Sequence, residues 1–117
     1  MYAHRADYEV PMEETCRAFD WLIRKGMAFY WGTSEWPVCK IEQAIGICKR
    51  YNLHAPIVEQ CEYSMLNRKT METKMVPLFK EYNYATTTFS PLAGGMLTGK
   101  YNEGIPEGSR NANKFMK

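Results

Sequence analysis

The chain has 117 residues, of which 45% are hydrophobic and 24% are charged, a balance typical of one folded domain and not of a disordered protein. The formal net charge of +2 is close to neutral, so the composition favours neither nucleic acid nor an anionic membrane surface as a partner. No apolar run approaches the roughly 18 residues of a membrane span, and the first residues do not form a signal-peptide pattern.

The four cysteines predict no metal site. They form no Cys-x-x-Cys pair, and neither histidine lies at zinc-finger spacing from them. Cys16 and Cys48 fall on apolar helical stripes, where a thiol packs as a small hydrophobic group. We therefore expect reduced cysteines in the core of a cytosolic protein.

The first third of the chain predicts a strand and then a helix. The run Met1–His4 indicates a short strand, and a polar loop over 5–10 follows. Pro11 opens a helix that continues to Lys25, and Gly26 can take the left-handed capping conformation. Apolar residues at helical spacing predict its buried face, which consists of Met12, Cys16, Phe19, Leu22 and Ile23.

The same order is repeated twice. A strand is predicted over about 28–33, followed by a helix that Pro37 opens and Asn52 caps, with a buried face of Ile41, Ala44, Ile45, Cys48 and Tyr51. A third strand is predicted over about 56–61. The stretch 67–82 carries an apolar stripe of Met71, Met75, Leu78, Phe79 and Tyr82, and Pro77 within it predicts a break or two short helices.

A fourth strand is predicted over about 85–89, and the glycine- and proline-rich stretch 91–110 is predicted to be an extended loop. Strands that alternate with helices indicate an α/β protein with a parallel sheet. The pattern alone leaves an open sheet and a closed barrel as alternatives.

Polar residues end the apolar runs at near-constant spacing: His4, Ser34, Gln60 and Ser90. The carboxyl ends of parallel strands meet at one edge, where α/β proteins build their sites. The hydroxyl of Ser34 and the carboxamide of Gln60 can pair with an amide-bearing ligand such as nicotinamide, and Phe89 offers a ring for stacking. Each residue alone is more often structural, but the set together favours a site.

Residues 94–100 match the spacing of a nucleoside-triphosphate loop, but Tyr101 stands where that loop needs serine or threonine. No helix is predicted after it. The glycines and Lys100 are instead typical of a backbone-and-cation cradle for a phosphate. The chain contains no Gly-x-Gly-x-x-Gly motif, so a Rossmann site has no support.

Several segments resemble the aldo-keto reductases, in particular the voltage-gated potassium channel beta subunits. They are YAHRAD at 2–7, PMEET at 11–15, YWGTSEW at 30–36, VEQCEY at 58–63 and FSPLAGG at 89–95. The likeness runs from Tyr2 to about Arg110. It implies a (β/α)8 barrel, of which this chain supplies about strands 4 to 7. It also implies an NADPH cofactor that passes hydride to an aldehyde or ketone.

The resemblance assigns roles to individual residues. His4 matches the histidine that orients and polarises the substrate carbonyl, Ser34 and Gln60 match the residues that hold the nicotinamide carboxamide, and Phe89 matches the aromatic ring that stacks on nicotinamide. The loop along the pyrophosphate corresponds to Ser90, Pro91, Leu92 and Gly94, and further cofactor contacts to Lys100, Ser109 and Arg110. Glu35 stands where animal channel subunits usually carry arginine, so no cofactor role is transferred to it.

The resemblance also implies that residues 1–117 are a fragment of a single oxidoreductase domain. In the family the catalytic tyrosine, lysine and aspartate belong to strands before Met1, and the segment that binds the adenosine 2′-phosphate lies beyond Lys117. Four strands of eight leave two open sheet edges, which invite pairing with other chains. We therefore expect a truncated product or partial gene model that aggregates or forms a loose oligomer when expressed alone.

Three functional readings follow. One is an NADPH-dependent reductase, or its cofactor-binding half, that acts on a small carbonyl substrate. The second is a regulatory subunit that senses the NADP redox state on a potassium channel alpha subunit, cytoplasmic and peripheral to the membrane through that partner, and homotetrameric in its full-length form. The third is an inactive fragment.

Overall fold

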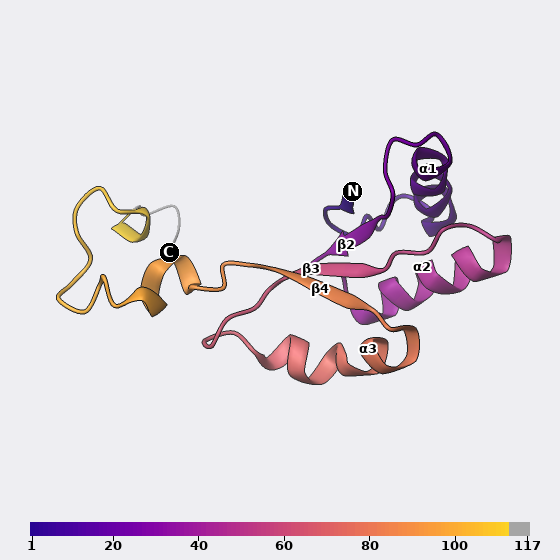
Figure 1. Cartoon of the computed structure of the whole chain (residues 1–117). Coiled ribbons are helices and arrows are strands. Elements are labelled where there is room, and N and C mark those ends of the chain that lie inside the picture. Colours follow the sequence, from indigo (N-terminus) through magenta and orange to yellow (C-terminus); the bar gives the residue numbers. More distant parts are fainter. Residues whose placement is uncertain (113–117) are drawn as a thin grey trace.

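The computed structural model describes residues 1–112, which form a parallel sheet with helices on one side and a long C-terminal loop (Figure 1). The strands are β1 (Tyr2–Ala3), β2 (Gly32–Ser34), β3 (Val58–Glu62) and β4 (Ala85–Phe89). The α-helices are α1 (Met12–Arg24), α2 (Val38–Tyr51) and α3 (Val76–Tyr82). Shorter turns of helix are η1 (Thr70–Lys74, a π-helix), η2 (Ala93–Thr98) and η3 (Arg110–Ala112).

All strand pairs are parallel and neighbours in space are neighbours in sequence, in the order β1-β2-β3-β4. The four predicted strands and their parallel arrangement are therefore confirmed. β2 begins at Gly32, later than the predicted residue 28, and Phe29 before it is 90% exposed. Residues 28–31 lie outside the strand, although the amino group of Met1 donates to the carbonyl oxygen of Tyr30 at 2.9 Å.

Prolines set the starts of the two long helices, as predicted. Pro11 and Pro37 are the N-cap residues of α1 and α2, and proline fits there because the first turn of a helix needs no backbone donor. Asn52 ends α2, which confirms it as the predicted cap, and it does so in the left-handed conformation with a φ of +53°. Tyr51 is 38% exposed and not buried as expected: its ring contacts the guanidinium groups of Arg17 and Arg50 instead of the apolar core.

The predicted break in 67–82 is confirmed, but it lies before Pro77. The π-helix η1 ends at Lys74, and Pro77 then occupies the first turn of α3, where it removes no helix hydrogen bond. Tyr82 was predicted to be buried on this stripe, but it is 41% exposed at the end of α3.

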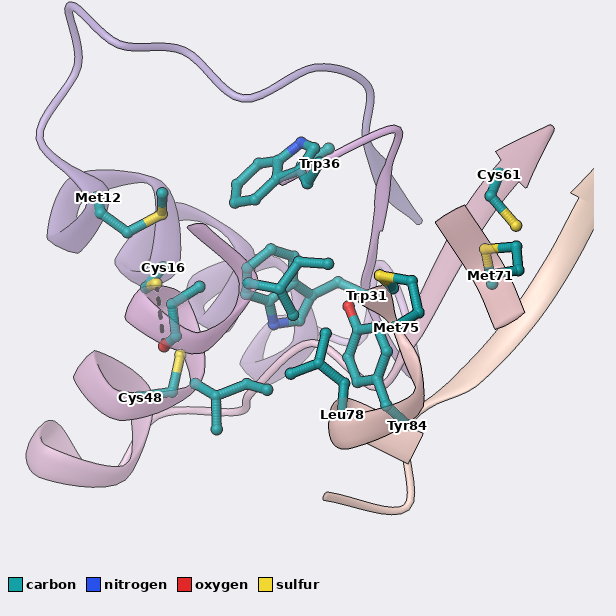
Figure 2. Close-up of a cluster of buried hydrophobic side chains, with 14 residues drawn as sticks. Met12, Cys16, Trp31, Trp36, Cys48, Cys61, Met71, Met75, Leu78 and Tyr84 are labelled. Atoms are coloured by element: carbon teal, nitrogen blue, oxygen red, sulfur yellow. Dashed lines mark hydrogen bonds between the residues drawn. The ribbon is translucent and has the colours of Figure 1, made fainter. Parts of the chain in front are cut away.

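The core lies between the sheet and the helices (Figure 2). Phe19 of α1 stacks on Trp31 with ring centroids 4.6 Å apart, and the indole N–H of Trp31 donates to the carbonyl oxygen of His54 at 2.7 Å. Figure 2 shows Cys16 beside Cys48, with the Cys16 thiol donating to the carbonyl oxygen of Ala44 at 3.7 Å. Both cysteines are free and buried, which confirms the predicted packing role.

A polar network ties α1 to the loop after α2. The buried carboxylate of Asp20 accepts hydrogen bonds from Nε of Arg24 at 2.6 Å and from the backbone N–H of His54 at 2.9 Å. Nδ1 of His54 lies 2.7 Å from the same carboxylate. Burial raises the pKa of Asp20, but these hydrogen bonds outweigh it and lower the pKa to about 2.

Across residues 1–112, every helix is too short or too polar to pass through a lipid bilayer.

Candidate functional site

The predicted strand-end residues lie along one edge of the sheet. Ser34 of β2 pairs in register with Gln60 of β3, and Gln60 pairs with Thr87 of β4. Register partners on neighbouring strands project to the same face of a sheet. The structure therefore brings the buried hydroxyl of Ser34 and the half-buried carboxamide of Gln60 together from positions 26 residues apart.

His4 lies at the same edge, directly after Ala3, the register partner of Thr33. It is exposed, and within residues 1–112 its ring has no hydrogen-bond partner. Phe89 ends β4 and is the register partner of Glu62, two residues beyond Gln60 on the same face. Its ring is partly exposed, as stacking on a ligand requires.

A buried polar network supports this edge from the other face of the sheet. The carboxylate of Glu59 accepts hydrogen bonds from the hydroxyl of Thr33 and, at 3.3 Å, from the backbone N–H of Trp36. The hydroxyl of Tyr84 lies 2.9 Å from that of Thr33 and donates to the carbonyl oxygen of Val58 at 3.1 Å. Burial raises the pKa of Glu59, although its hydrogen bonds lower it in part.

The two faces of β2 and β3 thus differ. Thr33 and Glu59 anchor the strands beneath the helices, and their neighbours Ser34 and Gln60 project from the opposite face. Sequence reasoning missed Thr33 and Glu59, because polar residues in a strand are normally read as solvent-facing.

A pocket of about 380 Å³ follows β4. It is lined by Ser90, Pro91, Leu92, Gly94, Gly95, Thr98 and Lys100. Five of the residues predicted to contact a cofactor are therefore brought together here, and Gly95 and Thr98 are additional. The predicted loop is less extended than expected, because η2 folds within it: the carbonyl oxygen of Leu92 accepts hydrogen bonds from the N–H groups of Gly95 and Leu97.

Lys100 is held against this pocket by close packing. A Cβ atom at Gly95 would lie 2.6 Å from Cε and 3.0 Å from Nζ of Lys100, so the lysine side chain lies directly over this glycine and would have to move if a side chain were added there. Gly95 also has a φ of +98°, which L side chains rarely adopt. The hydroxyl of Thr98 donates to the carbonyl oxygen of Gly95 at 2.7 Å and accepts from the N–H of Lys100 at 3.3 Å. The result is a cation beside a glycine turn.

The second predicted phosphate-contacting segment returns to the same loop. Nδ2 of Asn111 donates to the carbonyl oxygen of Gly94 at 3.2 Å, which places the backbone of Ser109 and Arg110 near the pocket. The hydroxyl of Ser109 is buried and has no hydrogen-bond partner in residues 1–112. Asn111 was not predicted, and no motif in the sequence marks it.

The described residues contain no group of three or more His, Cys, Asp or Glu side chains placed to hold a metal ion. The arrangement at the strand ends and the following loop has hydroxyl and amide groups at one end and a cation at the other. Such a set suits a ligand that carries both an amide and phosphate groups.

The family model for the aldo/keto reductase family matches residues 1–117, and the chain belongs to that family. The fold of the family is a (β/α)8 barrel, and the four parallel strands with their helices are part of such a barrel.

Relatives have been named provisionally as voltage-gated potassium channel subunit beta. One from Schizosaccharomyces pombe is 54% identical over 113 residues, which are 97% of this chain and 33% of the relative. Others from Arabidopsis thaliana and Oryza sativa subsp. japonica are 52% and 50% identical, each over 96% of this chain and 34% of the relative. The chain spans about a third of the length of these relatives.

Proposed function

We propose that residues 1–117 are part of a single oxidoreductase domain and that their role is to hold NADPH or NADP⁺. The observation that carries the proposal is the pocket after β4, where Lys100 is packed against Gly95 beside residues 90–94. An ammonium group next to a glycine turn provides both charge and close backbone approach for a pyrophosphate.

The nicotinamide end would be held at the strand ends. Ser34 and Gln60 offer a hydroxyl and a carboxamide from adjacent register positions, which suits the carboxamide of nicotinamide. Phe89 would stack on the ring, and Ser109 and Arg110 would add contacts to the phosphates. We also propose that the protein is located in the cytoplasm.

For the complete barrel we propose the reduction of a small aldehyde or ketone. NADPH supplies the hydride in such a reaction. His4, exposed at the same edge as Ser34, would orient and polarise the carbonyl oxygen of the substrate by a hydrogen bond from its ring.

A second candidate is a regulatory subunit of a voltage-gated potassium channel, and the names of the relatives favour it. In this reading the full-length protein is a homotetramer that binds a channel alpha subunit and senses the redox state of NADP. Co-purification of the full-length protein with a channel alpha subunit tests it, and a full-length protein that never binds the channel contradicts it.

The cofactor proposal is tested by titrating the chain with NADPH and following the cofactor fluorescence. The variant Lys100→Met should weaken binding by about tenfold or more, since it removes a charge-assisted contact to phosphate. The matched control is Lys25→Met. The ammonium group of Lys100 lies over the ring of Tyr101, and that of Lys25 lies over the ring of Trp21, but at the end of α1 and far from the loop. Equal NADPH affinities for the wild type and Lys100→Met, or no binding by the wild type, would contradict the proposal.

A further inference from the structure

Glu35 joins the ends of three strands. It follows Ser34 at the end of β2, and its backbone N–H donates to the carbonyl oxygen of Gln60 at 3.1 Å. Its φ of +55° lies in the left-handed region, which is uncommon for residues other than glycine. The chain therefore leaves the sheet at Glu35 at some conformational cost.

The side chain of Glu35 replaces a missing backbone acceptor. In a continuing parallel ladder, the residue that donates to Gln60 would accept from the N–H of Glu62 through its own carbonyl oxygen. The left-handed turn ends that ladder. The N–H of Glu62 instead donates to Oε1 of Glu35 at 2.6 Å, a short distance typical of a hydrogen bond to a charged acceptor.

The second carboxylate oxygen faces β1. Oε2 of Glu35 lies 3.7 Å from Nη1 of Arg5, the residue that follows His4. Both side chains are partly exposed, so this ion pair is the weaker of the two contacts. One carboxylate nevertheless touches the segment after His4 and the end of β3, next to the Ser34 and Gln60 pair.

We propose that Glu35 is a positioning residue for the nicotinamide end of the site. Its backbone and its carboxylate together bracket residues 60–62, and this fixes Gln60 against Ser34 in register. Through Arg5 it also restrains the segment that carries His4. The role toward nicotinamide rests on the proposed function, whereas the bracketing of residues 60–62 does not.

The first test needs no ligand. Amide hydrogen exchange of the whole chain, read by NMR, should be about tenfold faster at Glu62 in Glu35→Ala than in the wild type, because that N–H loses its acceptor. Glu35→Gln should stay close to the wild type, since its carbonyl oxygen can still accept. Glu42→Ala, which removes an exposed glutamate of α2, is the control. Unchanged exchange at Glu62 in Glu35→Ala would overturn the bracketing role.

The second test separates the two ends of the ligand, using dihydronicotinamide riboside and inorganic pyrophosphate as probes. Glu35→Ala should weaken riboside binding by about fivefold to tenfold and leave pyrophosphate binding unchanged, because Lys100 lies on a separate loop. Lys100→Met should do the reverse.

Each other outcome is informative. Riboside affinity that is unchanged in Glu35→Ala, or a parallel loss for both probes, overturns the positioning role. If the wild type binds neither probe, the proposed function is wrong, and the proposed role of Glu35 toward nicotinamide is wrong as well. The exchange rate at Glu62 still decides whether Glu35 brackets residues 60–62.

Discussion

The hydroxyl oxygen of Tyr2 lies 2.8 Å from Oγ1 of Thr87, and this contact joins the first and last strands across the exposed face of the sheet. In a flat sheet, β1 and β4 would be about 14 Å apart, three strand spacings. One tyrosine side chain can bridge them because the sheet curls toward this face. The curl is what a segment of a closed barrel requires.

Gly32 permits this crossing. A Cβ atom at Gly32 would lie 2.5 Å from Cγ1 and the carbonyl oxygen of Val58 and 3.0 Å from Cε1 of Tyr2. Gly32→Ala should therefore lower the free energy of unfolding by about 1–3 kcal/mol through overpacking. Gly46→Ala is the control, since nothing lies within 4 Å of its added Cβ in α2, and it should raise the free energy of unfolding by about 0.5–1 kcal/mol. Urea unfolding measures the free energy of unfolding of both variants. A Gly32→Ala protein as stable as the wild type would contradict the close approach at Gly32.

Gly95→Ala should impair phosphate binding with little change in the rest of the fold. The added Cβ would displace Cε of Lys100, so affinity for inorganic pyrophosphate should fall by about tenfold. Gly108→Ala is the matched control, because Gly108 also has a positive φ of +76° but nothing lies within 4 Å of its Cβ. Isothermal titration calorimetry compares them. A similar loss of affinity in both variants would mean that backbone strain, and not the lysine, is responsible.

Acid should destabilise the chain through Asp20. Its pKa is about 2 in the folded state against 3.8 ordinarily, so the folded state binds fewer protons than the unfolded state as the pH falls. This stabilisation is present above pH 5 and is lost as the pH falls toward 2. Asp20→Asn should flatten the dependence of the urea midpoint between pH 5 and pH 2.5. Glu42→Gln, at an exposed position of α2, should leave the dependence unchanged, and a steep dependence in Asp20→Asn would argue against this assignment.

Thiol reagents should distinguish one cysteine from the other three. Cys39 is exposed at the start of α2, whereas Cys16, Cys48 and Cys61 are buried. Burial also raises the pKa of Cys61 to about 11, which further reduces its thiolate fraction at neutral pH. A chromogenic disulfide should therefore titrate one thiol per native chain and four in denaturant, and Cys39→Ser should abolish the native reaction. Rapid native labelling of Cys39→Ser would show that the core opens.

The sequence was most informative where a single physical signal dominated. Pro11 and Pro37 marked helix starts because a helix tolerates proline at few positions outside its first turn. Motif resemblance, and not periodicity, indicated the barrel. By contrast, Asp20 belonged to no predicted stripe, and its burial depends on Arg24 and His54, which are 4 and 34 residues away. The contact with His54 is long-range and leaves no local pattern in the sequence.

The candidate site could also be predicted only where the sequence carries a recognisable signal. Ser34, Gln60 and the loop 90–100 could be found because strand ends converge and because their motifs resemble a known family. Glu35 could not, since its importance comes from a left-handed turn that directs its carboxylate onto β3. Asn111 was missed because its only distinguishing feature is a contact with Gly94, 17 residues earlier.

The parallel topology has a consequence for how this segment reaches its native state. Each strand pair joins residues that are 26 to 30 positions apart in the chain, as in Tyr2 with Gly32 and Thr33 with Glu59. Within residues 1–112 no strand hairpin is available to nucleate the sheet, so every strand pairing must first meet the entropic cost of closing a long loop. Helices α1 and α2 form from local contacts and shorten the loops that must be closed. Newly synthesised chains should therefore pass through a helical stage with unpaired strands, and this is when a chaperone would have the most to bind.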